Sequence, residues 1–181
     1  NGDIGAKKKY AMIDEDEKIK IRGFETVRRD WCRLARNTQD RVIRFILKSG
    51  NETEALKYTK EIINKIKERN IDKKDLLIKT QLKKPISEYK SISPHVTAAM
   101  KMKENGENVE VGTLIEYYIG ENGAKLVRDK AFLKNETIPY DTKYYLEKQI
   151  LPSVENIFHT FKIEIQEIID GQKQENLNKW F

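Results

Sequence analysis

Two segments near the N-terminus combine basic and aromatic residues at spacings that suit a polyanion. Lys7-Lys8-Lys9-Tyr10 opens a run of strand-forming residues. Because alternate side chains of a strand share a face, we expect Lys8 and Tyr10 to point one way and Lys7 and Lys9 the other. A lysine and a tyrosine on one face can reach a duplex minor groove and the adjacent phosphates. A solvated strand edge, on which lysines discourage aggregation, accounts for the same residues.

The second segment contains three arginines within ten residues, namely Arg22, Arg28 and Arg29. Their guanidinium groups match phosphate geometry, and the neighbouring acids Glu25 and Asp30 can hold them in register. A structural ion-pair network at a domain junction explains each single arginine equally well. We expect the three arginines to divide between these two roles.

The C-terminal residues form a third pattern, in which Gln174, Leu177, Trp180 and Phe181 are separated by polar spacers. One tight helical turn would place the leucine and the two aromatic residues on one side as an apolar plug. Aromatic residues dominate interface hot spots, so burial in a partner is expected, although folding back on the body is the alternative. The pattern matches the clamp-binding motif called the PIP box, which docks on the sliding clamp PCNA.

The elements that must position these residues follow from periodicity and turn residues. Two strand pairs are expected, residues 10–14 with 18–22 and residues 111–119 with 125–132. A first helix is expected from Trp31 to Lys48, with Asp30 as its N-cap and Gly50 as its end. A second helix is expected to start at Asn51 and to end before Asn70, and a third to run from Ser93-Pro94 to Asn105-Gly106.

A long last helix is expected to begin at Asp141 or Thr142 and to be kinked or split at Pro152. Its predicted core face consists of Leu146, Ile150, Val154, Ile157 and Phe161. Helices therefore dominate, and the predicted fold class is α+β.

Composition narrows the functional classes. Of the net charge of +6, residues 1–48 carry +5, with 13 Lys and Arg against 8 Asp and Glu. A localised basic surface favours a polyanionic partner.

Cys32 is the only cysteine, which excludes an internal disulfide and a multi-cysteine zinc site and favours a reducing, cytoplasmic setting. No apolar run approaches the roughly 20 residues of a membrane span. His95 and His159 have no local acid arrangement that indicates catalysis or metal binding.

Five blocks of the sequence resemble archaeal family B DNA polymerases, in the order that the family shows. Residues 7–10 and 21–31 resemble the end of the palm and the entrance to the thumb. Later blocks similar to the thumb are 89–96, 112–119 and 141–152. The resemblance implies an α+β fold, a helix-rich thumb domain preceded by a β-hairpin from the end of the palm. The implied domains are palm strands in 1–30, thumb in 31–170 and a clamp-binding tail in 171–181.

The resemblance also implies site residues for primer–template duplex DNA. Lys8 and Tyr10 correspond to minor-groove contacts, and Lys7 and Lys9 to backbone contacts. The implied phosphate-binding residues are Arg22, Arg28, Arg29, Lys90 and His95. Contacts of this kind are independent of sequence, as a replicative enzyme requires.

The aspartate-containing blocks with which the family binds two divalent ions are absent from this sequence. No catalytic residue and no metal ligand is therefore assigned, the chain alone is expected to be inactive, and Mg²⁺ is expected in a partner. The preferred interpretation is the small subunit of a split polymerase, which works with a large catalytic subunit and PCNA near the nucleoid. A piece of a longer chain also fits, and the alternative from another class is a stand-alone, thumb-derived accessory protein that binds DNA and the clamp.

Overall fold

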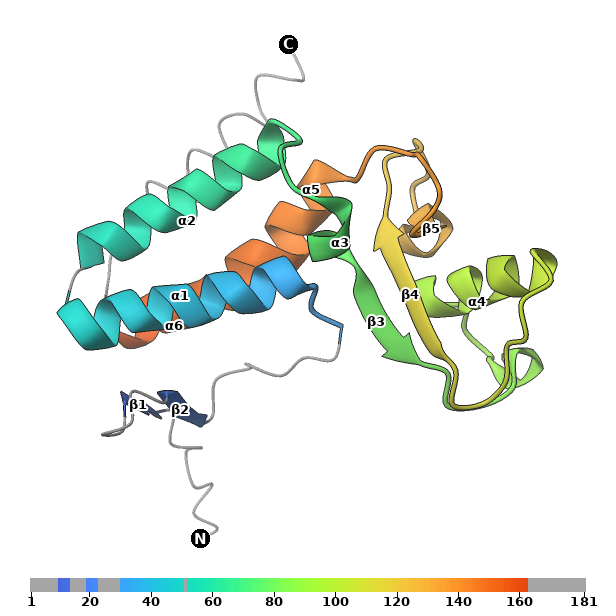
Figure 1. Ribbon diagram of the computed structural model, residues 1–181, viewed down its shortest axis with the longest axis horizontal. Coiled ribbons are helices and arrows are strands. Elements are labelled where there is room, and N and C mark those ends of the chain that lie inside the picture. The colour runs from blue at the N-terminus through green and yellow to red at the C-terminus, as the bar shows by residue number, and fades with distance from the viewer. Residues whose placement is uncertain (1–9, 14–18, 23–29, 51, 163–181) are drawn as a thin grey trace, which may run out of the picture.

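The computed structural model describes residues 10–13, 19–22, 30–50 and 52–162, and Figure 1 shows how their elements are arranged. The long helices α1 (Arg33–Ser49), α2 (Glu52–Lys67) and α6 (Leu151–Thr160) pack together as one helical layer. Beside it lies a three-stranded antiparallel sheet, with α4 (Pro94–Glu104) packed against β4 and β5. The predicted α+β class is confirmed.

The N-terminal strands form the predicted hairpin. β1 (Tyr10–Ile13) pairs antiparallel with β2 (Ile19–Arg22), and Tyr10 lies directly opposite Arg22 in the register. The predicted turn between the strands lies outside the described residues.

Helix α1 begins two residues later than predicted, at Arg33, so the prediction of Asp30 as its N-cap is wrong. Trp31 and Cys32 are buried, and Cys32 has an extended backbone and donates its N–H to the Gln149 side chain. That bond satisfies the N–H of the N-cap residue itself, and the Cys32 side chain makes no capping hydrogen bond. The other end agrees with the prediction, since Gly50 stops the helix in the left-handed conformation that favours glycine.

The sheet has the order β3-β4-β5, and its first strand was not predicted. β3 (Ile78–Gln81) pairs with β4 (Leu114–Ile119), which pairs with β5 (Ala131–Leu133). β4 starts later than predicted because Gly112, with φ 97°, lies in a turn. The Gly112 N–H donates to the Leu82 carbonyl.

The prediction of one strand over residues 125–132 is wrong for most of that range. A 3₁₀ turn, η2 (Val127–Lys130), occupies it, and Leu126 and Val127 are exposed rather than buried. β3 was missed because four residues give too short an alternation to distinguish a strand from a loop.

The predicted long helix from Asp141 is present, and its geometry changes along its length. Asp141 caps α5 (Thr142–Tyr144) by accepting from the Tyr144 N–H, and α6 follows a π-helical stretch, η3 (Tyr145–Ile150). Pro152 lacks an N–H and its ring would clash with the carbonyl four residues before it, so the turn that precedes it widens. The predicted interruption is therefore a π-helical turn directly before Pro152.

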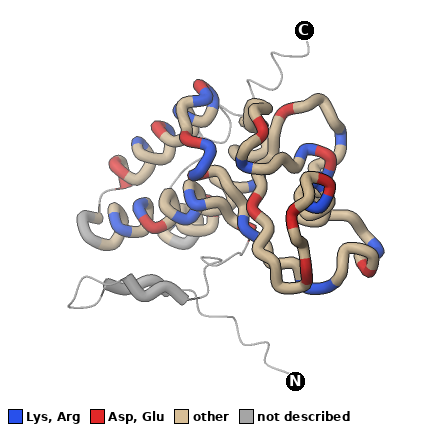
Figure 2. Tube along the Cα trace, turned by 45° about the vertical axis from the view of Figure 1, so that its right-hand side comes forward, with Lys and Arg blue, Asp and Glu red and all other residues tan. Residues whose placement is uncertain are grey.

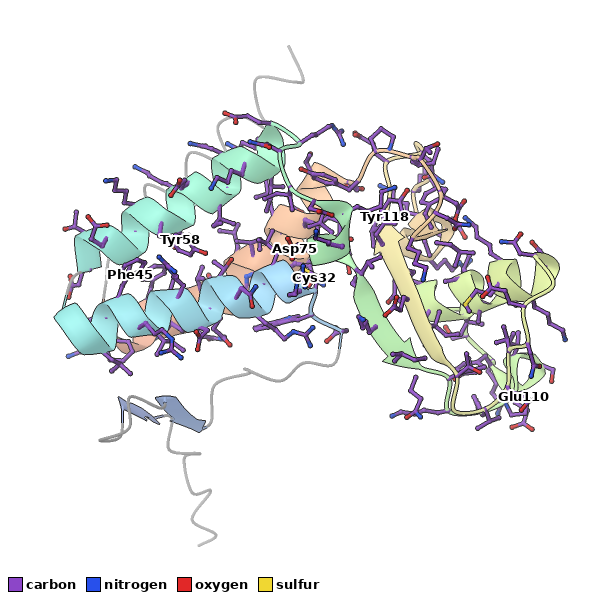
Figure 3. All side chains as sticks on the ribbon, viewed as in Figure 1. Cys32, Phe45, Tyr58, Asp75, Glu110 and Tyr118 are labelled. Atoms are coloured by element: carbon purple, nitrogen blue, oxygen red, sulfur yellow. The ribbon has the colours of Figure 1, made fainter. Side chains whose placement is uncertain are left out.

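Two groups of buried side chains hold these layers together. The larger joins α1, α2, the sheet, α4 and η3 and includes Trp31, Ile66, Tyr118 and Tyr145. The smaller lies at the far end of the helical layer, between α1, α2 and α6, and includes Val42, Ile43 and Phe158. Figure 3 shows Phe45 and Tyr58 between α1 and α2. Their ring centroids are 5.8 Å apart. No helix in the described part of the chain is both long and apolar enough to cross a bilayer.

Candidate nucleic-acid interface

A group of aromatic and basic residues gathers on the segment that links β3 to α4. This segment contains the 3₁₀ turn η1 (Ile86–Glu88). The rings of Tyr89 and His95 meet edge to face with centroids 5.6 Å apart, and the Lys84 ammonium lies 4.8 Å from the centroid of the Tyr89 ring. The Tyr89 hydroxyl accepts from the Lys83 N–H at 3.1 Å, which fixes the loop on itself. We call Lys83, Lys84, Tyr89, Lys90 and His95 the Tyr89 cluster.

The start of α4 positions His95. Ser93 occupies the N-cap position and Pro94 begins the helix, as predicted, and α4 ends with Asn105 as its C-cap. The Ser93 Oγ lies 2.8 Å from Nδ1 of His95, so the hydroxyl orients the ring instead of capping the helix. Partial burial, and then the nearby Lys83 charge, hold the pKa of His95 below its usual 6.5. The ring is therefore mostly neutral at pH 7 and offers hydrogen bonds rather than a charge.

The three lysines of the Tyr89 cluster have no acidic partner among the described residues, whereas several other lysines do. Lys79, Lys101 and Lys130 form ion pairs with Glu116, Glu136 and Asp141. Within the part of the chain that the structure describes, no carboxylate forms an ion pair with the three lysines of the cluster, Lys83, Lys84 and Lys90. Figure 2 shows acidic and basic residues interspersed along most of the described trace. Lysines free of carboxylates can neutralise phosphates without first breaking an ion pair.

The structure places only part of the predicted site. Lys90 is exposed and follows Tyr89 in the chain, and the ring of Tyr89 contacts His95. Tyr10 and Arg22 occupy directly opposed positions of the β1–β2 hairpin, which also brings them together. The other predicted contacts lie outside the described residues: Lys7, Lys8, Lys9, Arg28, Arg29, Gln174, Leu177, Trp180 and Phe181.

Several basic residues of α1 are engaged within the molecule. Arg33 bonds Asp75 at 2.5 Å and Arg44 bonds Asp40 at 2.8 Å. Arg41 lies over the Phe45 ring at 5.6 Å from its centroid. Arg33 and Arg44 thus form ion pairs within the molecule, and Arg41 contacts an aromatic ring.

Lys83 and Lys84 are functional candidates that sequence reasoning missed. The signal was present as Lys83-Lys84-Pro85 followed closely by Tyr89-Lys90. What could not be read from the sequence is that Lys84 lies over the ring of Tyr89 and that the loop closes through the Tyr89 hydroxyl.

The described residues do not supply a metal site. No group of three or more His, Cys, Asp or Glu side chains among them lies close enough to hold a metal ion. Several carboxylates are already neutralised by lysine or arginine, as Asp75 is by Arg33 and Asp141 by Lys130.

The described part of the chain combines a helical layer, a small antiparallel sheet and a loop in which Lys84 lies over the ring of Tyr89. The chain belongs to DNA polymerase family B, whose family model matches residues 4–161.

Relatives from archaea support the same assignment. The DNA polymerase of Pyrococcus horikoshii is 40% identical over 179 residues, which is 96% of this chain and 14% of that protein. The DNA polymerase of Methanocaldococcus jannaschii is 38% identical over 177 residues, or 97% of this chain and 11% of that protein. The solved structure of the family B DNA polymerase from the hyperthermophilic archaeon Pyrobaculum calidifontis superposes with a TM-score of 0.69 at 37% identity, covering 82% of this chain and 20% of that chain. This chain thus spans less than a quarter of the length of these relatives.

Proposed function

We propose that this chain is the part of a family B DNA polymerase that grips the primer–template duplex. In this proposal residues 1–30 complete the palm, residues 31–170 form the thumb and residues 171–181 form a clamp-binding tail. The observation that carries it is the Tyr89 cluster, in which the Lys84 ammonium lies over the ring of Tyr89, that ring contacts His95, and Lys83, Lys84 and Lys90 have no acidic partner among the described residues of this family member. The opposed positions of Tyr10 and Arg22 add a second contact region on the hairpin.

The proposed binding is independent of base sequence. Lysines and arginines neutralise phosphates, and a tyrosine at the minor groove reads shape rather than a base code. We expect the chain to bind duplexes of different sequence with similar affinity, and we expect that affinity to fall steeply as salt increases. Strong preference for one sequence in a binding assay would refute a duplex grip of this kind.

We further propose that the chain acts as the small subunit of a split polymerase, in which a large subunit supplies the aspartates that hold Mg²⁺. The support is the sequence resemblance to the end of the palm and to the thumb of these polymerases. Primer extension with Mg²⁺ and four nucleotides tests this, using the chain alone, a large subunit alone and the mixture. Extension that needs the mixture supports the proposal, whereas no stimulation together with intact duplex binding favours an accessory protein.

The tail is proposed to tether the polymerase to PCNA through Gln174, Leu177, Trp180 and Phe181. Replacing Leu177, Trp180 and Phe181 by Ala is expected to abolish PCNA binding in calorimetry and to leave duplex affinity unchanged. Ala at the spacer positions Glu175, Asn176 and Asn178 is the matched control and is expected to leave both unchanged. A parallel loss of duplex affinity in the first variant would contradict this division of roles.

A further inference from the structure

The imidazole of His95 is held on two sides at the start of α4. Its Nδ1 lies 2.8 Å from the Ser93 Oγ, and its ring meets the Tyr89 ring edge to face. The Tyr89 ring is itself fixed, because its hydroxyl accepts from the Lys83 N–H at 3.1 Å and the Lys84 ammonium lies 4.8 Å from its centroid. The direction of the imidazole is therefore set before any ligand arrives.

The other nitrogen of the ring, Nε2, is left for a ligand. His95 is half-buried, and its Nε2 forms no hydrogen bond with a described residue. Nor is this atom buried, because within the described part of the chain the Trp31 Nε1 is the one buried side-chain nitrogen or oxygen without a partner. The ring thus engages one nitrogen within the molecule and leaves the other accessible.

Two placements of the hydrogen fit the contact between Ser93 and His95, and the surroundings favour one of them. If the Nδ1–H donated to the hydroxyl oxygen, the hydroxyl proton would need a second acceptor, and no described residue offers one within hydrogen-bond distance. If the hydroxyl donates to Nδ1, its oxygen keeps its lone pairs free at the start of α4, where the helix dipole places partial positive charge. The second placement is therefore favoured.

The same surroundings keep the ring uncharged. Partial burial, and then the nearby Lys83 charge, hold the pKa of His95 below 6.5, so the ring is neutral at about pH 8. A neutral imidazole whose Nδ1 accepts a hydrogen bond carries its one proton on Nε2. His95 then offers an uncharged N–H, whereas the lysines of the Tyr89 cluster offer charges.

We propose that Ser93 is a positioning residue for duplex binding, which holds His95 as a neutral Nε2–H donor to an oxygen of the DNA backbone. This inference rests on the proposed function and adds a division of roles within the Tyr89 cluster. The lysines neutralise phosphates and so set the salt dependence of binding. His95 adds affinity through a neutral hydrogen bond, which displaces no counterion and leaves the salt dependence unchanged.

The first experiment determines the tautomer of His95 in the full chain without DNA. Long-range proton–nitrogen correlation NMR at about pH 8 distinguishes a protonated ring nitrogen from a bare one. In the wild type we expect a protonated Nε2 and a bare Nδ1. In Ser93→Ala we expect the Nδ1–H tautomer to become detectable, because the hydroxyl donor is gone. A wild-type ring protonated mainly on Nδ1 would overturn the proposal.

The second experiment measures duplex binding by anisotropy at about pH 8 and at several salt concentrations. His95→Ala is expected to bind roughly two- to tenfold more weakly than wild type, the range for the loss of one neutral hydrogen bond. Ser93→Ala is expected to bind roughly two- to fivefold more weakly, because the donor remains but is no longer oriented. Both variants should keep the wild-type slope of log K against log salt. A slope shallower by about 0.9 in His95→Ala would show a cationic contact and overturn the neutral donor.

Two further variants separate the hydroxyl of Ser93 from its place in the helix. Ser93→Thr keeps the hydroxyl and suits an N-cap, so it is expected to bind within roughly twofold of wild type. Ser91→Ala is the matched control, because Ser91 lies on the same segment, is exposed and forms no hydrogen bond with a described residue. It is expected to leave the affinity, the salt slope and the His95 tautomer unchanged. Circular dichroism checks that α4 stays intact in Ser93→Ala, as expected from the absence of a side-chain cap bond.

The double variant decides whether Ser93 acts through His95. In the His95→Ala background, Ser93→Ala is expected to change the affinity by less than about twofold, because the group that it orients is already absent. A loss as large as in the wild-type background would overturn the positioning role and leave the duplex grip standing. Wild-type affinity in both single variants would do the same. Absence of duplex binding by the wild-type chain would overturn the proposed function, and the role of Ser93 in binding with it.

Discussion

Replacing the three lysines of the Tyr89 cluster by Gln is expected to change how duplex binding responds to salt. Each phosphate contact contributes about 0.9 to the slope of log K against log salt. If Lys83, Lys84 and Lys90 each neutralise one phosphate, the triple variant loses about 2.7 units of slope. Between about 50 and 200 mM salt, the wild type then loses about 40-fold more affinity than the variant does. The fold is expected to stay intact, because the Lys83 group that bonds Tyr89 is its backbone N–H.

The assay is fluorescence anisotropy with a labelled duplex, repeated with a second duplex of unrelated sequence. A triple replacement of Lys57, Lys60 and Lys143 by Gln is the matched control, since these lysines are exposed and form no ion pair with a described residue. They lie on α2 and α5, away from the β3–α4 segment in Figure 1. Equal slopes for the cluster variant and the wild type would refute the assignment of phosphate contacts to this loop. Equal losses in the two triple variants would show that net charge alone matters.

Three further predictions concern single groups. The pKa of His95, followed by NMR, is expected to lie below 6.5 in the free chain and to rise when duplex is added. Since the pKa is depressed in the folded state, the folding stability should fall as the pH drops through about 6.5. An unchanged pKa on adding duplex would place His95 away from phosphates. Burial raises the pKa of Cys32 to about 11, so at pH 8 about one thiol in a thousand is ionised. A thiol reagent should therefore label the native chain only as it unfolds, and rapid labelling of the native chain would contradict the burial of Cys32. Gly120→Ala places a Cβ 2.5 Å from Cδ2 of Phe132 and should lower the free energy of unfolding, measured with denaturant, by about 1–3 kcal/mol. Gly123→Ala should cost less, because its Cβ meets no atom within 4 Å and only its positive φ is unfavourable.

Sequence periodicity located the elements whose signals are local. The N-terminal strands, the end of α1 at Gly50, the start of α4 at Ser93-Pro94 and the Asp141 cap are each set by residues within a few positions. Such signals act through backbone geometry and short-range hydrogen bonds, which are already defined by the neighbouring residues.

Elements set by tertiary contact were the ones that periodicity misplaced. β3 exists because β4 pairs with it, and α1 starts late because Gln149, far along the chain, takes the Cys32 N–H. The site shows the same division. Lys90 and His95 were predicted from the family's pattern, whereas the proposal of Lys83 and Lys84 depends on how the loop closes around Tyr89.

The π-helical turn before Pro152 also bears on how chains of this kind can vary in length. A π turn is an α-helix that holds one additional residue, so loss of one residue there leaves a continuous α-helix on both sides. Deletion of the exposed Lys148, for example, would shorten the chain without opening a loop. Insertions and deletions normally accumulate in surface loops. The π-helical turn is a site outside the surface loops where the chain can gain or lose one residue. Sequence alignments across residues 145–152 should therefore allow for a one-residue gap inside that helix.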